Sequence, residues 1–281
     1  MRRSAAAVWR RSNFSSLVGP SLRCRRFPCR LSGPGSVSLI RARALVLFAI
    51  PLREKDRIVT FLTEEAGTKR GVARGARKLQ SAYASVLEPM TEVNVVFFER
   101  ENRDLFRVDS IDLVRSSFPL ADELSRALLL SAMAEALATF VSDSDPSEKF
   151  FRLARHCLDA LFADVDTRQV AVYFDLWMLH LSGVFPAIAE CSSCGARFPA
   201  GEIYLDETVP GFVDRRCAKA GAVRVSSSAA AGIRAILTRR VPDIALPPAA
   251  SVEIARVAGR LRRNFLGHEL KSQNVLAEIF G

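Results

Sequence analysis

The sequence predicts an α+β protein in which a small β-barrel is followed by a helical domain that carries a ribbon-like insertion. Three observations support this prediction. Five short candidate strands lie between residues 44 and 115, with no helical period until late in this segment. Apolar residues then recur at helical spacing between residues 118 and 183. Beyond them, the pair Cys191-x-x-Cys194 is followed by a second half-site, Asp214-x-x-Cys217.

The N-terminal segment differs in charge from the rest of the chain. Residues 1–43 contain ten arginines and no acidic residue, whereas the remaining 30 Lys and Arg residues are balanced by 30 Asp and Glu residues. Residues 1–40 show no apolar period, and we expect a disordered basic extension that is dispensable for folding. An organellar targeting segment and a start codon placed too far upstream are alternative explanations of this composition. The net charge of +10 therefore says little about the folded part.

Residues 41–117 are expected to form the barrel. Strands are predicted at Ala44–Ile50, Arg57–Thr63, Lys69–Ala76, Thr91–Glu99 and Leu105–Val114. Five short strands in a segment of this size are typical of the OB-fold, a barrel that binds oligonucleotides. The strand aromatics Phe61, Phe97, Phe98 and Phe106 have apolar neighbours, so most of them are assigned to the barrel core and not to base stacking.

Residues 118–281 are expected to form a helical domain with the ribbon-like insertion at 187–223. Pro119 and the acidic residues after it indicate one helix start, and Asp145–Glu148 is close to a capping box with a proline in the first turn. A third helix ends at Gly183 and Pro186. Further helices are predicted at Ser228–Arg239, Ser251–Leu266 and 272–280.

Sequence signatures of catalysis and of membrane insertion are missing from the chain. It contains no G-x-x-x-x-G-K-[ST] loop and no nucleophile elbow, and its three histidines have no partner motif. We therefore expect a protein that is not an enzyme, with no catalytic residue and no nucleotide cofactor. No apolar run reaches the roughly 18 residues that a membrane span needs. The Cys-x-x-Cys pattern suits a reducing compartment, and a cytoplasmic, nucleoid-associated location is expected.

The densest acid-free basic stretch of the folded part is a candidate DNA-binding site. Its charges are Lys69, Arg70, Arg74, Arg77 and Lys78. Phosphate binding needs this kind of charge, and in a regular strand Arg70 and Arg74 would lie on the same side. The alternative is a strand edge that charge protects against aggregation.

The order of residues in the chain resembles the RecO family of bacterial recombination-repair mediators. The resemblance covers residues 44–281 and rests on these motifs: Pro51-Leu-Arg-Glu-Lys-Asp-Arg-Ile-Val-Thr60, Glu65-Ala-Gly67, Gly71-Val-Ala-Arg-Gly-Ala-Arg77, Leu87-Glu-Pro89, Leu179–Gly183 leading into Cys191-Ser-Ser-Cys194-Gly195, and Leu270-Lys-Ser272. The basic N-terminal extension is not part of the family pattern. Asp214 also departs from it, because metal-binding members usually have a cysteine there.

The resemblance implies an OB-fold, a helical domain and a zinc site. It also implies a non-enzymatic mediator of recombinational DNA repair of the RecF-pathway type, which binds and anneals single- and double-stranded DNA. Such a mediator works with RecR and single-stranded-DNA-binding protein, and it helps to load RecA onto protein-coated single strands. The alternative is a zinc-ribbon module that binds protein and not nucleic acid.

The candidate metal ligands are Cys191, Cys194, Asp214 and Cys217. Three thiolates and one carboxylate oxygen can hold a structural zinc ion, although closed zinc sites favour sulfur and nitrogen. A metal-free ribbon held by apolar contacts is the other possibility, and the sequence leaves both open.

A second candidate site, for a partner protein, lies near the C-terminus. The resemblance implies that the acidic, apolar-ended tail of single-stranded-DNA-binding protein docks on the helical domain. Arg260, Arg262 and Arg263 offer carboxylate-binding groups beside Leu261 and Phe265. The alternative for these arginines is a solvated helix face.

Overall fold

The computed structural model of the protein describes residues 37–280, apart from 79–80, 82, 84–85, 101–104, 144, 199–200, 207 and 210. The expectations for the N-terminal extension therefore fall mostly on residues 1–36, which lie outside the described residues. The first strand already begins at Val37, four residues before the boundary expected at 41.

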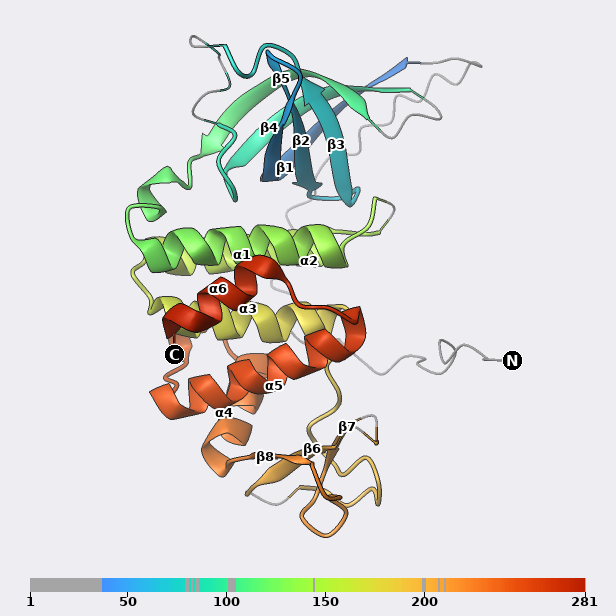
Figure 1. The fold of residues 1–281 in the computed structure, drawn as a ribbon, viewed down its shortest axis with the longest axis vertical. Coiled ribbons are helices and arrows are strands. Elements are labelled where there is room, and N and C mark those ends of the chain that lie inside the picture. Colours follow the sequence, from blue (N-terminus) through green and yellow to red (C-terminus); the bar gives the residue numbers. More distant parts are fainter. Residues whose placement is uncertain are drawn as a thin grey trace, which may run out of the picture. The chain divides into compact units, whose positions relative to one another are not determined.

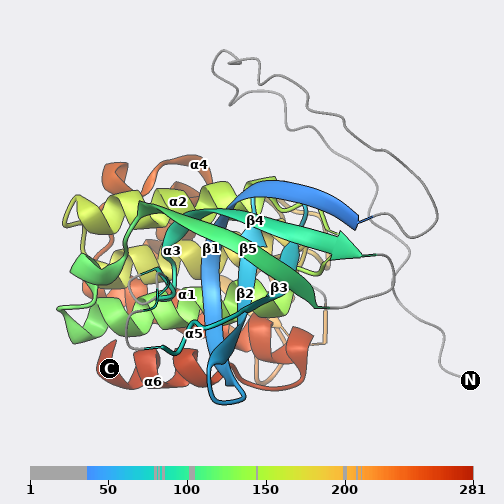
Figure 2. The same cartoon turned by 90° about the horizontal axis from the view of Figure 1, so that it is seen from above.

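The N-terminal part is a closed five-stranded barrel, which confirms the predicted OB-like fold (Figures 1 and 2). Its strands are β1 (Val37–Leu52), β2 (Asp56–Thr63), β3 (Thr68–Ala73), β4 (Glu92–Arg100) and β5 (Phe106–Arg115). They close in the order β1-β2-β3-β5-β4, with β3 and β5 parallel and the other pairs antiparallel. Phe61 and Phe97 are buried inside it, as expected for core residues.

The C-terminal part is helical, and a small sheet inserted in the chain between α3 and α4 lies at the lower end of Figure 1. The helices are the short 3-10 turn η1 (Phe118–Leu120), α1 (Leu124–Phe140), α2 (Glu148–Phe162), α3 (Thr167–Leu181), α4 (Ser227–Thr238), the 3-10 turn η2 (Val241–Asp243), α5 (Pro248–Leu266) and α6 (Lys271–Phe280). Helix α1 is apolar on several sides because it contacts β1 and β2 as well as α3 and α6. None of the described helices combines the length and the apolar composition that a membrane crossing requires.

The inserted ribbon is a small sheet with the strand order β7-β6-β8. Its strands are β6 (Ile203–Asp206), β7 (Gly211–Val213) and β8 (Val223–Val225). Ile203, Phe212 and Val225 are fully buried and belong to the same apolar core as the helices. The ribbon is therefore anchored by packing as well as by any ion that it holds.

The barrel and the helices are joined by a buried hydroxyl. Ser147 donates a hydrogen bond of 2.7 Å to the carbonyl of Thr63 and accepts one of 2.8 Å from the N–H of Gly67. The expected capping box at Asp145–Glu148 is wrong, because α2 begins only at Glu148 and the Asp145 carboxylate accepts the N–H of Ser142 at 3.2 Å. Gly67 has φ +69°, and a Cβ there would lie 2.2 Å from the carbonyl oxygen of Ser142. The backbones at Gly67 and Ser142 approach each other too closely for any side chain at position 67.

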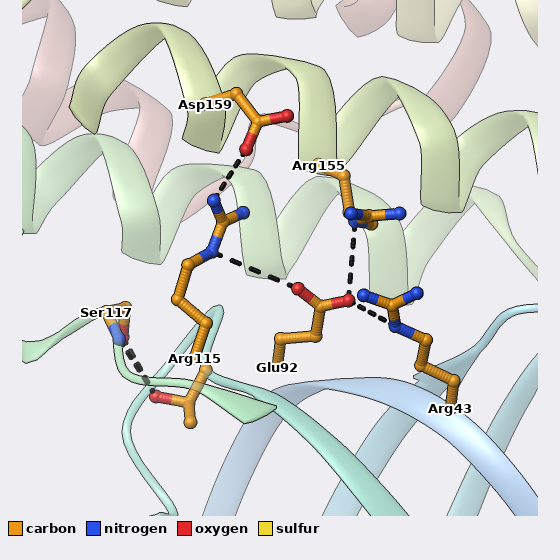
Figure 3. Close-up of polar contacts among 7 residues, drawn as sticks. Arg43, Glu92, Arg115, Ser117, Arg155 and Asp159 are labelled. Carbon is orange, nitrogen blue, oxygen red and sulfur yellow. Dashed lines mark hydrogen bonds and ion pairs between the residues drawn. The ribbon is translucent and has the colours of Figure 1, made fainter. Parts of the chain in front are cut away.

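A second joint is a cluster of charges around Glu92, whose side chain is only 2% exposed (Figure 3). The Nε atoms of Arg43 on β1 and Arg155 on α2 lie 2.5 and 3.3 Å from its Oε1. Arg115 lies 3.9 Å from Oε2, and its Nη1 also pairs with Asp159 on α2 at 2.5 Å. These contacts with Glu92 are ion pairs without hydrogen-bond geometry, and they connect the barrel to the helical domain.

Candidate functional site

The predicted basic stretch lies at the end of β3 and in the turn after it. Strand β3 ends at Ala73 and not at Ala76, so a regular strand does not place Arg74 beside Arg70. Both arginines are nevertheless exposed, and neither has an acidic partner among the described residues. Lys69 differs, because its Nζ donates to the carbonyl of Asp143 and lies 5.6 Å from the ring centroid of Phe106.

The fold brings the turn Arg53–Asp56, which carries two basic and two acidic residues, beside this stretch. In the turn between β1 and β2, the carbonyls of Arg53 and Lys55 accept hydrogen bonds from the Nη1 and the backbone N–H of Arg77, at 2.8 and 3.0 Å. Asp56 accepts the N–H of Gly75 at 2.9 Å, which fixes one turn against the other. The sequence had indicated only a polar turn at 53–56, because the pairing of the two turns depends on tertiary contacts.

Together these turns carry six exposed basic side chains, with the exposed Glu54 among them, and we call the six the basic edge. It consists of Arg53, Lys55, Arg70, Arg74, Arg77 and Lys78, all of them exposed. The turn between strands 1 and 2 is one of the loops through which OB-folds bind oligonucleotides. Exposed guanidinium and ammonium groups on such a loop can neutralise phosphates.

The four predicted metal ligands come together at the tip of the ribbon. Their ligand atoms, from Cys191, Cys194, Asp214 and Cys217, all lie within 4.8 Å of one another. Around tetrahedral zinc, ligand atoms are about 3.3–3.8 Å apart, so a contraction of about 1 Å would complete such a site. The cluster can hold a metal ion.

The carboxylate of Asp214 has two roles in this cluster. Its Oδ1 accepts the N–H groups of Arg216 and Cys217, both at 2.9 Å, which shapes the second turn. Its Oδ2 faces the cluster and accepts the thiol of Cys194 at 3.7 Å. The hydrogen bond from the Cys217 N–H holds the pKa of Asp214 below its ordinary value, so the carboxylate is ionised at neutral pH. An anionic oxygen therefore stands where a thiolate would complete the set.

The three predicted partner-binding arginines do not behave alike. Arg262 is 12% exposed, and its Nη1 lies 2.5 Å from each carboxylate oxygen of Asp175 on α3, so it is paired within the chain and does not lie on a solvated helix face. Arg263 is exposed and pairs with Glu269 at 2.5 Å. Arg260 is partly exposed and also has an interaction within the chain.

All three arginines line a pocket of about 430 Å³ between α3, α5 and α6. The pocket has an apolar lining that includes Leu129, Phe174 and Leu276. Arg168 and Arg256 add two positive charges that were not predicted from the sequence. Arg168 lies on α3, and Arg256 lies on α5 one turn before Arg260. Apolar side chains and arginines line this pocket together, with Asp175 and Glu269 paired to two of the arginines, and such a lining suits a ligand with acidic and apolar groups.

Comparison with known families agrees with this arrangement of domains. Residues 37–117 match the family Recombination protein O N terminal, and residues 121–274 match Recombination protein O C terminal. The chain belongs to the RecO family. Together the two matches cover the barrel and the helical domain.

Relatives of the RecO family are similar to the chain over most of its length. A protein of Anaeromyxobacter sp. (strain K), named DNA repair protein RecO, is 33% identical over 248 residues, which cover 85% of this chain and 96% of that protein. A protein with the same name from Anaeromyxobacter dehalogenans (strain 2CP-1 / ATCC BAA-258) is 33% identical over 84% of this chain and 94% of its own. The RecO of Koribacter versatilis (strain Ellin345) is 36% identical over 157 residues, which cover 56% of this chain and 64% of that protein.

Proposed function

We propose that this RecO-family protein is a non-enzymatic mediator of recombinational DNA repair that binds and anneals DNA through the basic edge. The observation that carries the proposal is the acid-free basic turn after β3, held by hydrogen bonds against the β1–β2 turn of an OB-like barrel, with Arg70 and Arg74 free of acidic partners among the described residues. Annealing needs no catalytic group. Neutralised phosphates let two strands approach, and base pairing then supplies the specificity.

The test replaces Arg70, Arg74, Arg77 and Lys78 by alanine in the full chain. Each lost phosphate contact lowers the log–log salt slope of binding by about 0.7 for single strands and 0.9 for duplexes, so the variant should lose about 3 to 4 units of slope. Its annealing of complementary oligonucleotides should slow in parallel. Binding and annealing equal to those of the parent would remove the basic edge from the proposal.

A matched control removes the same charges elsewhere. Lys149, Arg152, Arg239 and Arg240 are also three arginines and one lysine, and all are exposed in the helical domain. Their replacement by alanine should leave the salt slope close to that of the parent. Repeating both quadruple variants in a chain without residues 1–36 separates the basic edge from the N-terminal arginines. A parent that binds no DNA in either form would favour the protein-binding ribbon module instead.

The mediator role also requires a partner, and we propose that the pocket between α3, α5 and α6 receives the acidic, apolar-ended tail of single-stranded-DNA-binding protein. The apolar side chains that line the pocket suit the end of the tail, and the arginines that line it suit the carboxylates of the tail. Arg262 contributes indirectly, since Asp175 holds it in the wall. Contacts with RecR, and through these partners with RecA, complete the proposed role in loading recombinase.

Charge reversal tests this docking site. Arg260→Glu with Arg263→Glu should weaken binding of the tail peptide at least tenfold, while Arg239→Glu with Arg240→Glu should leave it unchanged. Arg262 stays intact in both variants, because a glutamate beside Asp175 would destabilise the fold. Equal affinities of the two variants for the peptide would exclude the pocket.

The ribbon cluster has a structural part in this proposal. Zinc, when bound, would cross-link the two turns that carry Cys191–Cys194 and Asp214–Cys217. All four residues would be ligands of the ion, which leaves no open position for water in a tetrahedral site. Zinc content after purification without chelator, at about one ion per chain or none, decides between a zinc ribbon and a metal-free one.

A further inference from the structure

A β-bulge in β1 turns one aromatic side chain out of the barrel. Val46 pairs with Phe61 and is buried in the barrel core, and the next paired residue on β1 is Phe48, opposite Thr60. In a regular strand Phe48 would follow Val46 into the interior, because side chains two residues apart share a face. The extra residue at the bulge, Leu47, is buried in the helical core, and Phe48 reaches the outer surface with 36% of its side chain exposed.

The rows of the sheet at Phe48 and at Ile50 combine apolar residues with one arginine. The row of Phe48 across the sheet continues through Thr60 on β2 to Arg70 on β3. The next row consists of Ile50, which is 51% exposed, and of the half-buried Ile58 and Val72. These two rows contain no acidic residue. We call the apolar part, formed by Phe48, Ile50, Ile58 and Val72, the stacking face.

The stacking face and the basic edge meet at Arg70. Neighbouring strands are about 4.8 Å apart, so the backbones of Phe48 and Arg70 are about 10 Å apart across β2, and the long arginine side chain can span part of this distance. A nucleotide whose base covers the Phe48 ring can therefore keep its phosphate near a guanidinium. Unpaired bases expose an apolar ring face that can use such a platform, whereas the bases of a duplex are already stacked on one another.

We propose that the stacking face binds unpaired bases, with Phe48 as the stacking residue, and that it makes the site prefer single-stranded over duplex DNA. This inference rests on the proposed function, since the basic edge must hold the backbone of the same strand. Charge complementarity selects this occupant, because the acid-free face borders cations and nucleic acid is the partner that combines apolar rings with regular negative charge.

The test compares Phe48→Ala with the parent in the full chain, using fluorescent oligothymidylate and a blunt duplex of equal length. The variant should bind the single strand about 5- to 100-fold more weakly, which corresponds to the loss of one stacked base. Its affinity for the duplex should change less than twofold, and its salt slope should not change, because no charge is removed. Phe48→Trp should keep single-strand affinity, and Phe48→Leu should lose most of it while preserving an apolar surface. Phe118→Ala removes a ring that is 64% exposed at η1, outside the face, and should leave binding unchanged.

Two results would overturn the inference: single-strand affinity of Phe48→Ala equal to that of the parent, or an equal loss on single strand and duplex. If Phe48→Ala fails to fold by circular dichroism, Phe48→Leu carries the comparison with the same criteria. The test of Phe48 can fail without the proposed function failing, and the two failures give different results. Normal binding by Phe48→Ala together with weak binding by the Arg70, Arg74, Arg77 and Lys78 variant rejects only the stacking residue. Normal binding by the quadruple variant rejects the basic edge.

Discussion

Replacing Glu92 by glutamine should destabilise the joint between the barrel and the helices. The substitution keeps the volume of the side chain but removes the negative charge that Arg43, Arg115 and Arg155 surround (Figure 3). Three guanidinium groups would then remain close together with no carboxylate between them. Asp159 would still pair with Arg115 from the surface, where it is 55% exposed.

The size of the effect follows from burial. Removing one partner of a fully buried ion pair costs about 3–5 kcal/mol, because the other charge stays uncompensated. Glu92 meets this condition with 2% exposure, but the arginine side chains are 31–36% exposed and can regain water. We therefore expect the free energy of unfolding to fall by about 2–4 kcal/mol.

The assay is urea denaturation followed by far-UV circular dichroism and by tryptophan fluorescence. Two probes are needed because a chain with a barrel and a helical domain need not unfold in a single step. Glu88→Gln is the matched control, since Glu88 is exposed and the substitution changes charge in the same way. It should change the unfolding free energy by less than about 0.5 kcal/mol. A double-mutant cycle with Arg155→Met should give a coupling energy of about 0.5–3 kcal/mol across the joint.

A Glu92→Gln variant as stable as the Glu88→Gln control would refute this role of Glu92. Strict additivity of Glu92→Gln and Arg155→Met would also refute it, because the two side chains would then not interact.

Three further predictions concern other parts of the molecule. Gly67→Ala should lower the unfolding free energy more than Gly183→Ala, because both glycines have positive φ but only a Cβ at Gly67 meets backbone, at 2.2 Å; equal urea midpoints would contradict this. Burial and the nearby Arg240 lower the pKa of His156, whose Nε2 accepts the Val241 N–H, so the unfolded chain takes up the proton first. Stability should therefore fall as the pH drops below about 6.5, and less steeply in His156→Gln, as measured by urea titrations at several pH values. Asp214→Cys should bind zinc more tightly than the parent in competition with a chelator, because a fourth thiolate replaces an oxygen ligand; equal affinity would mean that residue 214 does not face the ion.

Local patterns in the sequence were sufficient to predict the strands and helices and the four candidate metal ligands. Short apolar segments between turns predicted the five strands, and helical spacing predicted Ser228–Arg239, which lies one residue from the bounds of α4. The two Cys-containing half-sites specified four side chains that the fold brings within 4.8 Å of one another. In each case the signal depends on residues close together in the chain, or on a spacing that only one kind of site uses.

Features that depend on distant residues could not be predicted in this way. The Ser147 hydroxyl bonds to Thr63 and Gly67, some 80 residues earlier, and so does not cap its own helix. Arg262 is paired with Asp175 on another helix, which no pattern within α5 reveals. The outward position of Phe48 depends on a single extra residue in β1, and a strict two-residue period assigns that side chain to the wrong face.

Arginines in this protein therefore have two different roles, and the count of positive charges does not distinguish them. Arg43, Arg115 and Arg155 surround a buried carboxylate, whereas Arg70 and Arg74 face solvent without acidic partners among the described residues. Replacing an arginine that contacts Glu92 leaves this buried carboxylate with fewer counter-ions. DNA binding would then fall because less of the protein is folded. Replacing Arg70 or Arg74 removes a phosphate contact from a folded protein, so the salt slope falls while the urea midpoint stays constant. Measuring both quantities on the same variant assigns each arginine to the joint or to the DNA interface.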